Sequence, residues 1–439
     1  MMLFYLLQGG FTMSEYGLIG KKLSHSFSKI IHEKLADYTY DLMPLSEEQL
    51  DDFMRKKAFQ GINVTIPYKK TVIPYLDFID EHAKAIGAVN TIVNRDGKLY
   101  GYNTDYDGFD YMIQHHHVPI QDQKVLVLGN GGAAAAIKAV CRNHRAKQIL
   151  CVSRHPKDDA ISYKEVYANH CDADIIINTS PVGMYPHIDE QAVDLNDFPK
   201  CKAVLDVVYN PICTKLCLQA REKGLLYAAG MEMLIVQAIR AKEHFLQDTT
   251  PQKVIDQILF DLLMEKTNLV FIGMPSCGKS TIGKKVAQLS QKKFIDLDEE
   301  IEKEAQKTIP EIFAETGEAV FRELETKVTK RISASQNLVI ACGGGIIKSK
   351  INIDALRLNG VLIFLDRDLD QLESNDPTRP LSCSQKAVED MYHQRMPYYL
   401  QYSDIQIVNN TDLDTIAQTS IQKVKDHIQD LICTGGKTI

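Results

Sequence analysis

The 439-residue chain lacks the features that mark several large classes of protein. Its ten cysteines include no CxxC pair, so neither a disulfide framework nor a cysteine-rich zinc site is indicated, and reduced, mostly buried thiols are expected. No apolar run is long enough to cross a membrane as a helix. There is also no Gly/Ser/Pro-rich linker, internal repeat or low-complexity tract, so any hinge between domains is expected to be short.

The chain also lacks a strong excess of charge of one sign. Its formal net charge is -7, from 50 basic and 57 acidic side chains, which gives no electrostatic reason to expect nucleic acid or an anionic membrane as a partner. The apolar run Leu3–Leu7 has five residues and no basic flank, so it does not resemble a signal peptide. Because a second methionine, Met13, precedes the first patterned segment, we expect residues 1–12 to be a disordered extension or to result from a wrongly assigned start, and we expect the protein to be cytoplasmic.

The length exceeds what one hydrophobic core organises and predicts two or three domains. Apolar strands alternate with helical stretches, which predicts an α/β protein with parallel sheets in both halves. Two glycine-rich turns, each preceded by a strand and followed by a helix, divide the chain. A helical pattern over 231–264 stops before a new strand, which predicts the boundary between the halves near Met264–Thr267.

The first glycine-rich turn matches a dinucleotide-binding motif. Gly129 permits the tight turn, Gly131 permits close approach of the backbone to a pyrophosphate, and Ala134 permits close packing of helix on strand. The next strand ends at Arg154, where an acidic residue would bind a ribose 2′-hydroxyl and an arginine suits a 2′-phosphate. The pattern favours NADP over NAD; a plain glycine turn and a solvated arginine are the alternatives.

The region before this turn carries many hydroxyl and amide side chains among apolar neighbours. Such groups need hydrogen-bond partners when buried, and a polyhydroxylated acid would supply them. Reduction of a ketone by hydride transfer also needs a proton for the developing alkoxide, which Lys69 with Asp105 could provide and orient. For any one of these residues, a turn or a helix cap is the alternative.

Eight motifs in order give residues 16–263 a resemblance to shikimate dehydrogenase. They are Gly17–Ser28, Gly61–Lys69, Gly87–Thr91, Gly101–Gly108, Gly129–Ala134, Ile177–Met184, Asp206–Pro211 and Gly230–Gln237. The resemblance implies Lys69 as catalytic acid/base with Asp105 beside it. It implies shikimate contacts by Ser24, Ser26, Asn63, Thr65, Asn90, Thr104, Tyr209 and Gln237. It implies NADP contacts by Gly129, Asn130, Gly131, Gly132, Ala133, Ser153, Arg154 and Gly230.

The second glycine-rich turn is a P-loop, Gly273-x4-Gly278-Lys279-Ser280. Its amides cradle phosphates, its lysine bridges them and its hydroxyl reaches Mg²⁺. Phosphoryl transfer also needs a carboxylate near the metal, and Asp296 with Asp298 would share one face at the end of a strand. Further candidates, each with a solvated or structural alternative, are Arg322, Gly343 to Gly345, Arg379 and Arg395.

This second region resembles shikimate kinase over about 268–404. The matching residues are Phe294–Asp298, Ile301, Glu302, Ile309–Phe313, Gly317, Glu318, Phe321, Arg322, Glu325, Gly343–Gly345, Arg379–Leu381, Arg395–Tyr399 and Asp404. The resemblance implies ATP contacts by Gly273, Ser276, Cys277, Gly278, Lys279, Ser280, Thr281 and Arg379. It places Ser280 and Asp296 at magnesium, and shikimate on Asp298, Arg322, Gly343, Gly344, Gly345 and Arg395. Lys279, Asp296 and Arg379 would be catalytic, and Glu325 would support Arg322.

Together the resemblances imply an α/β substrate domain over 13–107 plus 231–264, a Rossmann-type NADP domain over 108–230, and a P-loop kinase domain over 268–439 with a lid at about 375–387. The chain would reduce 3-dehydroshikimate with NADPH and phosphorylate the shikimate with ATP and Mg²⁺, with small molecules as its partners. The Ser24/Ser26 pair favours shikimate over quinate. The alternatives are a quinate-type dehydrogenase joined to another small-acid kinase, or one half kept as a regulatory module. Monomer and homodimer both remain open.

Three adjacent histidines, His115 to His117, are the remaining metal-like feature. Adjacent residues of a helix point in different directions, so the pattern favours a solvated helix end or turn over a metal site.

Overall fold

The computed structural model describes residues 15–23, 27–157, 159–372 and 384–434. Residues 1–12, Ser24, Ser26 and Arg379 lie outside these ranges, as does most of the predicted lid. The chain groups into two compact units, one containing Met1–Ser180, Pro199–Cys201 and Met231–Ile258, the other Pro181–Phe198, Lys202–Gly230 and Leu259–Ile439. In the described part of the chain, no helix combines the length and the apolar content needed to span a bilayer.

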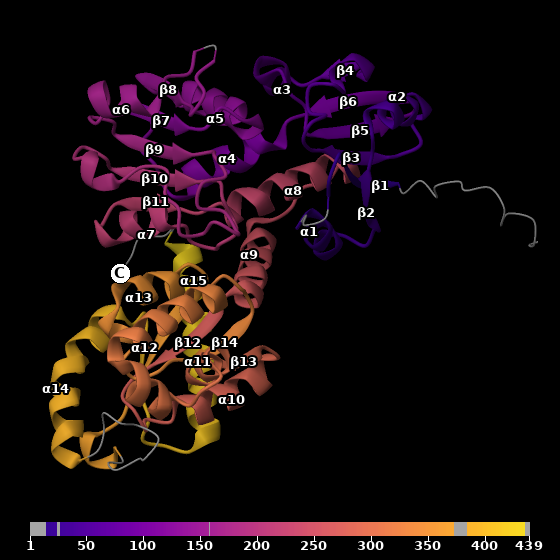
Figure 1. The fold of residues 1–439 in the computed structure, drawn as a ribbon. Coiled ribbons are helices and arrows are strands. Elements are labelled where there is room, and N and C mark those ends of the chain that lie inside the picture. Colours follow the sequence, from indigo (N-terminus) through magenta and orange to yellow (C-terminus); the bar gives the residue numbers. More distant parts are fainter. Residues whose placement is uncertain (1–14, 24–26, 158, 373–383, 435–439) are drawn as a thin grey trace, which may run out of the picture. The chain divides into compact units, whose positions relative to one another are not determined.

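The first unit opens with a six-stranded sheet in the order β2-β1-β3-β5-β6-β4 (Figure 1). The strands are β1 (Tyr16–Gly20), β2 (Tyr40–Pro44), β3 (Gly61–Val64), β4 (Phe78–Ile79), β5 (Thr91–Arg95) and β6 (Lys98–Tyr102). The helices of this region are α1 (Ser28–Leu35), α2 (Glu47–Lys56), α3 (Glu81–Ile86) and α4 (Thr104–His115). Fully buried Ile19, Met54 and Ile92 belong to its core.

This first sheet is mixed, whereas the sequence predicted parallel pairing. Strands β5 and β6 pair antiparallel and form a hairpin. The two residues between them, Asp96 and Gly97, have φ of 52° and 81°. Two positive φ values are what a tight hairpin turn requires, so local turn chemistry overrides the general pattern here.

The same unit contains three parallel strands around the first glycine-rich turn, with β7 paired to both β8 and β9. The strands are β7 (Lys124–Leu128), β8 (Gln148–Val152) and β9 (Ile175–Asn178), with helices α5 (Gly132–Asn143) and α6 (Tyr163–Asn169). The helical pattern over 231–264 is two helices, α8 (Met231–Leu246) and α9 (Gln252–Lys266). Helix α4 packs against α8, because Gly108 lets the backbones approach: a Cβ there would lie 2.7 Å from the Met233 carbonyl oxygen.

The second unit contains the parallel pair β10 and β11 and a five-stranded parallel sheet in the order β13-β14-β12-β15-β16. The strands are β10 (Ala203–Asp206), β11 (Leu226–Ala228), β12 (Asn268–Ile272), β13 (Lys293–Asp296), β14 (Leu338–Ala341), β15 (Gly360–Asp366) and β16 (Ile405–Val408). The helices are α7 (Lys215–Glu222), α10 (Lys279–Ser290), α11 (Leu297–Ala305), α12 (Ile309–Ser333), α13 (Lys350–Arg357), α14 (Gln385–Tyr402) and α15 (Leu413–Cys433).

This strand order creates a binding crevice. The chain leaves β12 on one side to reach β13, and β14 then inserts between them, while β15 flanks β12 on the other side. Ligands of open parallel sheets bind at the carboxyl ends of strands where the order reverses in this way. The P-loop follows β12, and the Gly343–Gly345 segment follows β14, so both glycine segments lie at this edge.

Candidate active sites

A lysine and a carboxylate meet in the first unit. The Lys69 ammonium donates a hydrogen bond of 2.5 Å to Asp105 Oδ2, and the Asn90 side-chain amide donates to Asp105 Oδ1 at 3.0 Å. Only 18% of the lysine side chain and 13% of the aspartate side chain are exposed. Because both carboxylate oxygens are held, Asp105 fixes the position of an ammonium group that can release a proton.

Beside this pair runs a buried chain of polar side chains. Tyr40 donates to Asn63 Oδ1 at 2.7 Å, and Asn63 Nδ2 donates to the Thr91 hydroxyl at 3.0 Å. The Thr91 and Thr104 hydroxyls lie 3.2 Å apart, and the Thr104 backbone N–H donates to Asn90 Oδ1 at 2.7 Å. The sequence did not single out Tyr40 or Thr91 as site residues. Thr91 stands next to Asn90 in a recognised motif, whereas Tyr40 comes from a different strand and gave no local signal.

The other predicted substrate contacts of this half are more scattered. Thr65 follows β3 and is partly buried, and Gln237 on α8 donates through Nε2 to the Leu234 carbonyl at 2.9 Å. Tyr209 and Gly230 belong to the second unit, and burial raises the pKa of the Tyr209 hydroxyl. A Cβ at Gly230 would lie 2.3 Å from the Val207 carbonyl oxygen, so only glycine fits that position.

The turn after β7 presents its backbone to solvent. Gly129 has φ 118°, and a Cβ there would lie 2.8 Å from the Thr179 hydroxyl oxygen. In contrast, a Cβ on Gly131 or Gly132 would meet nothing within 4 Å. Asn130, Gly131 and Gly132 are exposed, and Ala133 is half-buried at the start of α5. Open amides at a helix N-terminus suit a pyrophosphate.

At the end of β8, the predicted 2′-phosphate contacts lie close to this turn along the sheet. Ser153 accepts a hydrogen bond of 3.2 Å from the His155 backbone N–H, and Arg154 is exposed. Strands β7 and β8 are neighbours, so the turn and Arg154 lie at the same edge. The residues present therefore fit a phosphorylated dinucleotide.

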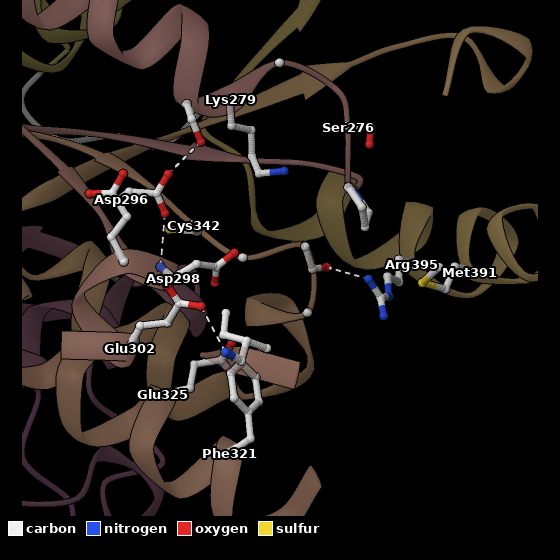
Figure 2. A pocket seen from close by; sticks show the side chains of 18 of the residues that line it. Ser276, Lys279, Asp296, Asp298, Glu302, Phe321, Glu325, Cys342, Met391 and Arg395 are labelled. Atoms are coloured by element: carbon white, nitrogen blue, oxygen red, sulfur yellow. Dashed lines mark hydrogen bonds between the residues drawn. The ribbon is translucent and has the colours of Figure 1, made fainter. Parts of the chain in front are cut away.

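The second unit holds a cavity of about 640 Å³ at the carboxyl ends of its central strands (Figure 2). The predicted residues on its wall are Ser276, Gly278, Lys279, Ser280, Thr281, Asp296, Asp298, Arg322, Gly343, Gly344, Gly345 and Arg395. Figure 2 shows Lys279, Asp296 and Asp298 on one side of this space and Arg395 on another. Residues from the P-loop, β13, α11, α12, the segment after β14, and α14 thus converge on one cavity.

The P-loop geometry depends on its glycines. Gly273 and Gly278 have φ of 149° and 95°, and a Cβ on Gly273 would lie 2.6 Å from the Leu365 carbonyl oxygen. The Lys279 ammonium is buried and donates to the carbonyl oxygens of Gly273 at 3.0 Å and Met274 at 2.7 Å. The lysine therefore lies folded against the loop from which it can reach bound phosphates.

A hydroxyl and a carboxylate meet next to the loop. The Ser280 hydroxyl donates to Asp296 Oδ2 at 2.6 Å, and the Asp298 backbone N–H donates to Asp296 Oδ1 at 3.0 Å. The prediction that Asp296 and Asp298 share a strand face was wrong, because Asp296 caps α11 and Asp298 lies in its first turn. Both still line the cavity. The hard oxygens of Ser280 and Asp296 fit Mg²⁺.

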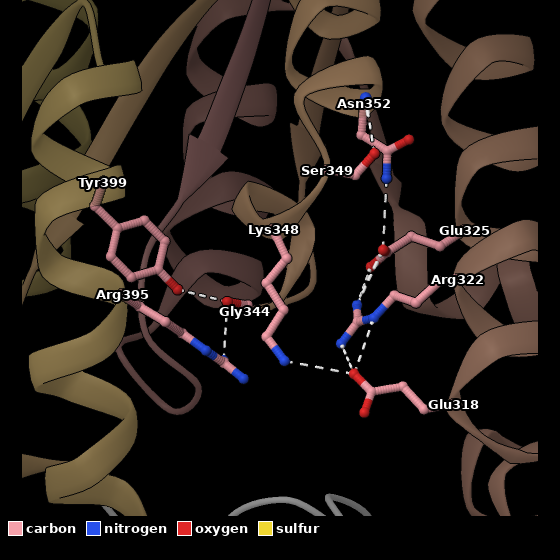
Figure 3. Close-up of polar contacts among 9 residues, drawn as sticks. All are labelled: Glu318, Arg322, Glu325, Gly344, Lys348, Ser349, Asn352, Arg395 and Tyr399. Carbon is pink, nitrogen blue, oxygen red and sulfur yellow. Dashed lines mark hydrogen bonds and ion pairs between the residues drawn. The ribbon is translucent and has the colours of Figure 1, made fainter.

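Arg322 is held between two glutamates (Figure 3). Its Nη1 donates to both carboxylate oxygens of Glu325, at 3.0 and 2.9 Å, and its Nη2 donates to Glu318 at 3.0 Å. Burial disfavours the charge of Arg322, but the two carboxylates outweigh this and raise its pKa. The guanidinium is therefore charged, and a Cβ at Gly345 would lie only 2.6 Å from Nη2. It suits a substrate carboxylate.

A second arginine lies across the cavity on α14. Arg395 is 4% exposed and donates through Nη1 to the Gly344 carbonyl oxygen at 2.9 Å, which Tyr399 also contacts at 2.6 Å (Figure 3). A Cβ at Gly343 would lie 2.6 Å from Asp298 Oδ1, and one at Gly344 would lie 2.8 Å from Pro275. The three glycines thus let the chain pass between these groups.

Several cavity residues were not predicted as site residues. Glu318 contacts Arg322, while Arg367, Phe313, Phe321 and Met391 line the wall. Arg367 follows β15, the neighbour of the P-loop strand, so its place after an apolar strand was an available signal. Phe313 and Phe321 on α12 stand among the residues that match shikimate kinase, but the resemblance assigned them no contact with a ligand.

Comparison with known proteins finds a match in each half of the chain. The protein-family model of the shikimate dehydrogenase substrate binding domain matches residues 18–92, and the protein-family model of shikimate kinase matches residues 275–425. An NADP(+)-dependent shikimate dehydrogenase of Clostridium beijerinckii is 41% identical over 246 residues, covering 53% of this chain and 91% of its own length.

Solved structures resemble the first half of the chain. A chorismate mutase/shikimate 5-dehydrogenase fusion protein from Clostridium acetobutylicum is 37% identical with a TM-score of 0.53, covering 57% of this chain and 97% of its own. A shikimate 5-dehydrogenase from Thermus thermophilus, solved with NADP(H) and shikimate, is 25% identical with a TM-score of 0.51, covering 56% and 98%.

Proposed function

The chain belongs to the shikimate dehydrogenase family in its first half and carries a shikimate kinase domain in its second, and from this premise we propose how its residues divide the work. It is a bifunctional enzyme of the shikimate pathway. The first site reduces 3-dehydroshikimate to shikimate with NADPH, and the second phosphorylates the 3-hydroxyl of shikimate with ATP. The observation that supports this function best is that the two halves match two different families independently, and that shikimate is the product of the first reaction and the substrate of the second.

In the first site, Lys69 acts as the general acid. NADPH, when bound, supplies the hydride that adds to the carbonyl carbon. The oxygen then gains charge, and the Lys69 ammonium gives it the proton that completes the hydroxyl. Asp105, 2.5 Å from the lysine nitrogen, orients the ammonium and stabilises its charge before transfer. Asn63, Thr65, Asn90, Thr104, Tyr209 and Gln237, with Ser24 and Ser26, hold the substrate hydroxyls and carboxylate.

The residues assigned to the cofactor are those around the turn after β7. Gly129, Asn130, Gly131, Gly132 and Ala133 would hold the pyrophosphate through backbone amides. Ser153 and Arg154 would hold the 2′-phosphate, and Gly230 would lie by the nicotinamide. The open backbone and the exposed arginine support this assignment.

In the second site, the protein positions and stabilises charge. ATP with Mg²⁺, when bound, supplies the phosphoryl group, with Ser280 and Asp296 on the metal side. Lys279 neutralises charge on the phosphates, and Gly273, Ser276, Cys277, Gly278 and Thr281 form the rest of the phosphate cradle, which Arg379 would complete. Asp298 orients the attacking hydroxyl. Arg322, Arg395 and the amides of Gly343, Gly344 and Gly345 hold the acceptor.

The domain boundaries and the cellular location are part of this proposal. We assign 13–107 plus 231–264 to the substrate domain, 108–230 to the NADP domain, and 268–439 to the kinase domain. A cytoplasmic location is supported by the use of NADPH and ATP and by the free thiols of the nine cysteines in the described ranges.

A substrate panel tests the acceptor specificity. We expect NADP⁺-dependent oxidation of shikimate to exceed that of quinate, and ATP-dependent phosphorylation of shikimate with no phosphorylation of quinate. Initial rates measured spectrophotometrically for both acids give the comparison. Quinate turned over as fast as shikimate in either half would favour the quinate-type alternative.

The two glutamates on Arg322 give a matched pair of variants. Glu325 is 2% exposed in its side chain and accepts from Arg322 Nη1 through both carboxylate oxygens, whereas Glu318 is 44% exposed. A hydrogen bond between charged groups is worth about 1.5 kcal/mol or more, so Glu325→Gln should raise the kinase KM for shikimate about tenfold. Glu318→Gln should raise it less than about threefold, because exposed pairs contribute little. Steady-state kinetics would show equal effects of both variants if burial were irrelevant.

A further inference from the structure

Two of the three adjacent histidines meet a buried glutamate. His115 ends α4, His116 follows it, and Glu232 lies in the first turn of α8, 117 residues away from His115. His115 Nδ1 contacts Glu232 Oε1, and His116 Nε2 lies 2.7 Å from Glu232 Oε2. The prediction of a solvated helix end was wrong for these two side chains, since only 22% and 11% of them are exposed. His117 is exposed, as predicted.

The geometry points to a transition-metal site. The three ligand atoms lie within 4.8 Å of one another, and in the described ranges no other trio of His, Cys, Asp or Glu side chains meets that condition. Donors around a tetrahedral Zn²⁺ lie about 3.3 Å apart, given Zn–N and Zn–O bonds of about 2.0 Å. Small rotations of the side chains would therefore bring the three groups onto one ion. We propose that His115, His116 and Glu232 bind Zn²⁺ or a similar divalent transition metal.

The chemistry of the donors selects the metal. Two imidazole nitrogens and one carboxylate form a common zinc ligand set with a position left for water, whereas Mg²⁺ and Ca²⁺ prefer oxygen ligands alone. The buried Glu232 side chain is only 6% exposed. A divalent cation offsets the charge of this buried carboxylate, which gives binding an electrostatic driving force beyond that of an exposed cluster.

A metal ion bound at this cluster would connect two helices that carry proposed site residues. Helix α4 carries Thr104 and Asp105 at its other end, and α8 carries Gln237. The two helices already pack closely at Gly108. A metal between the end of α4 and the start of α8 would cross-link them near the proposed boundaries of the substrate and NADP domains. We therefore expect Zn²⁺ to stabilise the first unit.

The test uses the full-length chain, stripped of metal with a chelator. Isothermal titration calorimetry should show that one Zn²⁺ ion binds tightly to each chain. The protein should also melt at a higher temperature with Zn²⁺ than with Mg²⁺. Both His116→Asn and Glu232→Gln should lower the affinity for this Zn²⁺ ion at least ~100-fold and remove the rise in melting temperature. His117→Asn is the matched control, because His117 is adjacent in sequence but exposed, and it should bind as the parent chain does. Retained shikimate kinase activity shows that each variant is folded in its other half.

A second readout separates a metal site from a hydrogen-bonded cluster. Co²⁺ in the proposed site should give visible absorption bands of a low-coordinate nitrogen and oxygen environment, lost in His116→Asn and kept in His117→Asn. The proposal would be overturned if the parent chain bound no Zn²⁺ ion tightly. Equal Zn²⁺ binding by the parent chain, His116→Asn and Glu232→Gln would also overturn it, since the ion would then bind elsewhere. Neither result bears on the dehydrogenase or kinase assignments.

Discussion

Replacement of Lys69 by alanine should lower NADPH-dependent reduction of 3-dehydroshikimate by about 10²- to 10⁴-fold, the usual contribution of a positioned general acid. The lysine nitrogen lies 2.5 Å from Asp105, whose other oxygen is held by Asn90. Alanine removes the proton donor and leaves this hydrogen-bonded frame in place. The main effect should therefore fall on kcat, with a smaller change in KM, as measured by NADPH absorbance.

The matched control is the neighbouring Lys70, which is exposed and should tolerate alanine without loss of either activity. Phosphorylation of added shikimate should proceed at the parental rate in Lys69→Ala. Loss of phosphorylation in a folded Lys69→Ala protein would mean that the sites are not independent. Equal losses of reduction in the Lys69 and Lys70 variants would refute the role given to Lys69.

Replacement of Lys279 by alanine should lower shikimate phosphorylation by at least about 10²- to 10³-fold, the effect of removing one preorganised charge from a developing transition state. The ammonium is buried against the carbonyl oxygens of Gly273 and Met274, so it is held where phosphates would bind. A coupled assay for ADP formation measures this loss. Dehydrogenase activity in the same protein should be unchanged.

Lys284 provides the control for this variant. It lies on the same helix, α10, but is exposed, so Lys284→Ala should retain the kinase activity. Circular dichroism would show whether Lys279→Ala keeps its fold. A Lys279→Ala enzyme with more than about a tenth of parental kinase activity would contradict the electrostatic role of the lysine.

The sequence predicted best where a function depends on contiguous residues. The P-loop and the turn after β7 are single segments whose glycines have local conformational reasons, and both lie where their strand and helix neighbours required. Lys69 and Asp105 come from separate motifs, and the sequence joined them through the proton that ketone reduction needs and through the resemblance to a family. The structure brings them together through the sheet that links β3 to the start of α4.

The contacts that the sequence could not predict join distant residues for which no local pattern gave a signal. The contact of His115 and His116 with Glu232 joins residues more than a hundred positions apart, and no local pattern indicates that α8 would cover the end of α4. The hydrogen bond from Tyr40 to Asn63 joins β2 and β3, which lie on either side of β1, so it depends on the order of the strands in the whole sheet. The wrong prediction that Asp296 and Asp298 share a strand face had a local cause. Asp296 is both the last residue of β13 and the N-cap of α11, so the helix begins before Asp298.

The most direct test of the central claim is mass spectrometry of one reaction containing the purified chain, 3-dehydroshikimate, NADPH, ATP and Mg²⁺. We expect shikimate to form first and shikimate 3-phosphate to follow from it. Shikimate that accumulates without phosphate would contradict the kinase assignment, and added shikimate would confirm that failure. The absence of any shikimate would contradict the dehydrogenase assignment and with it the claim that one chain carries out both steps.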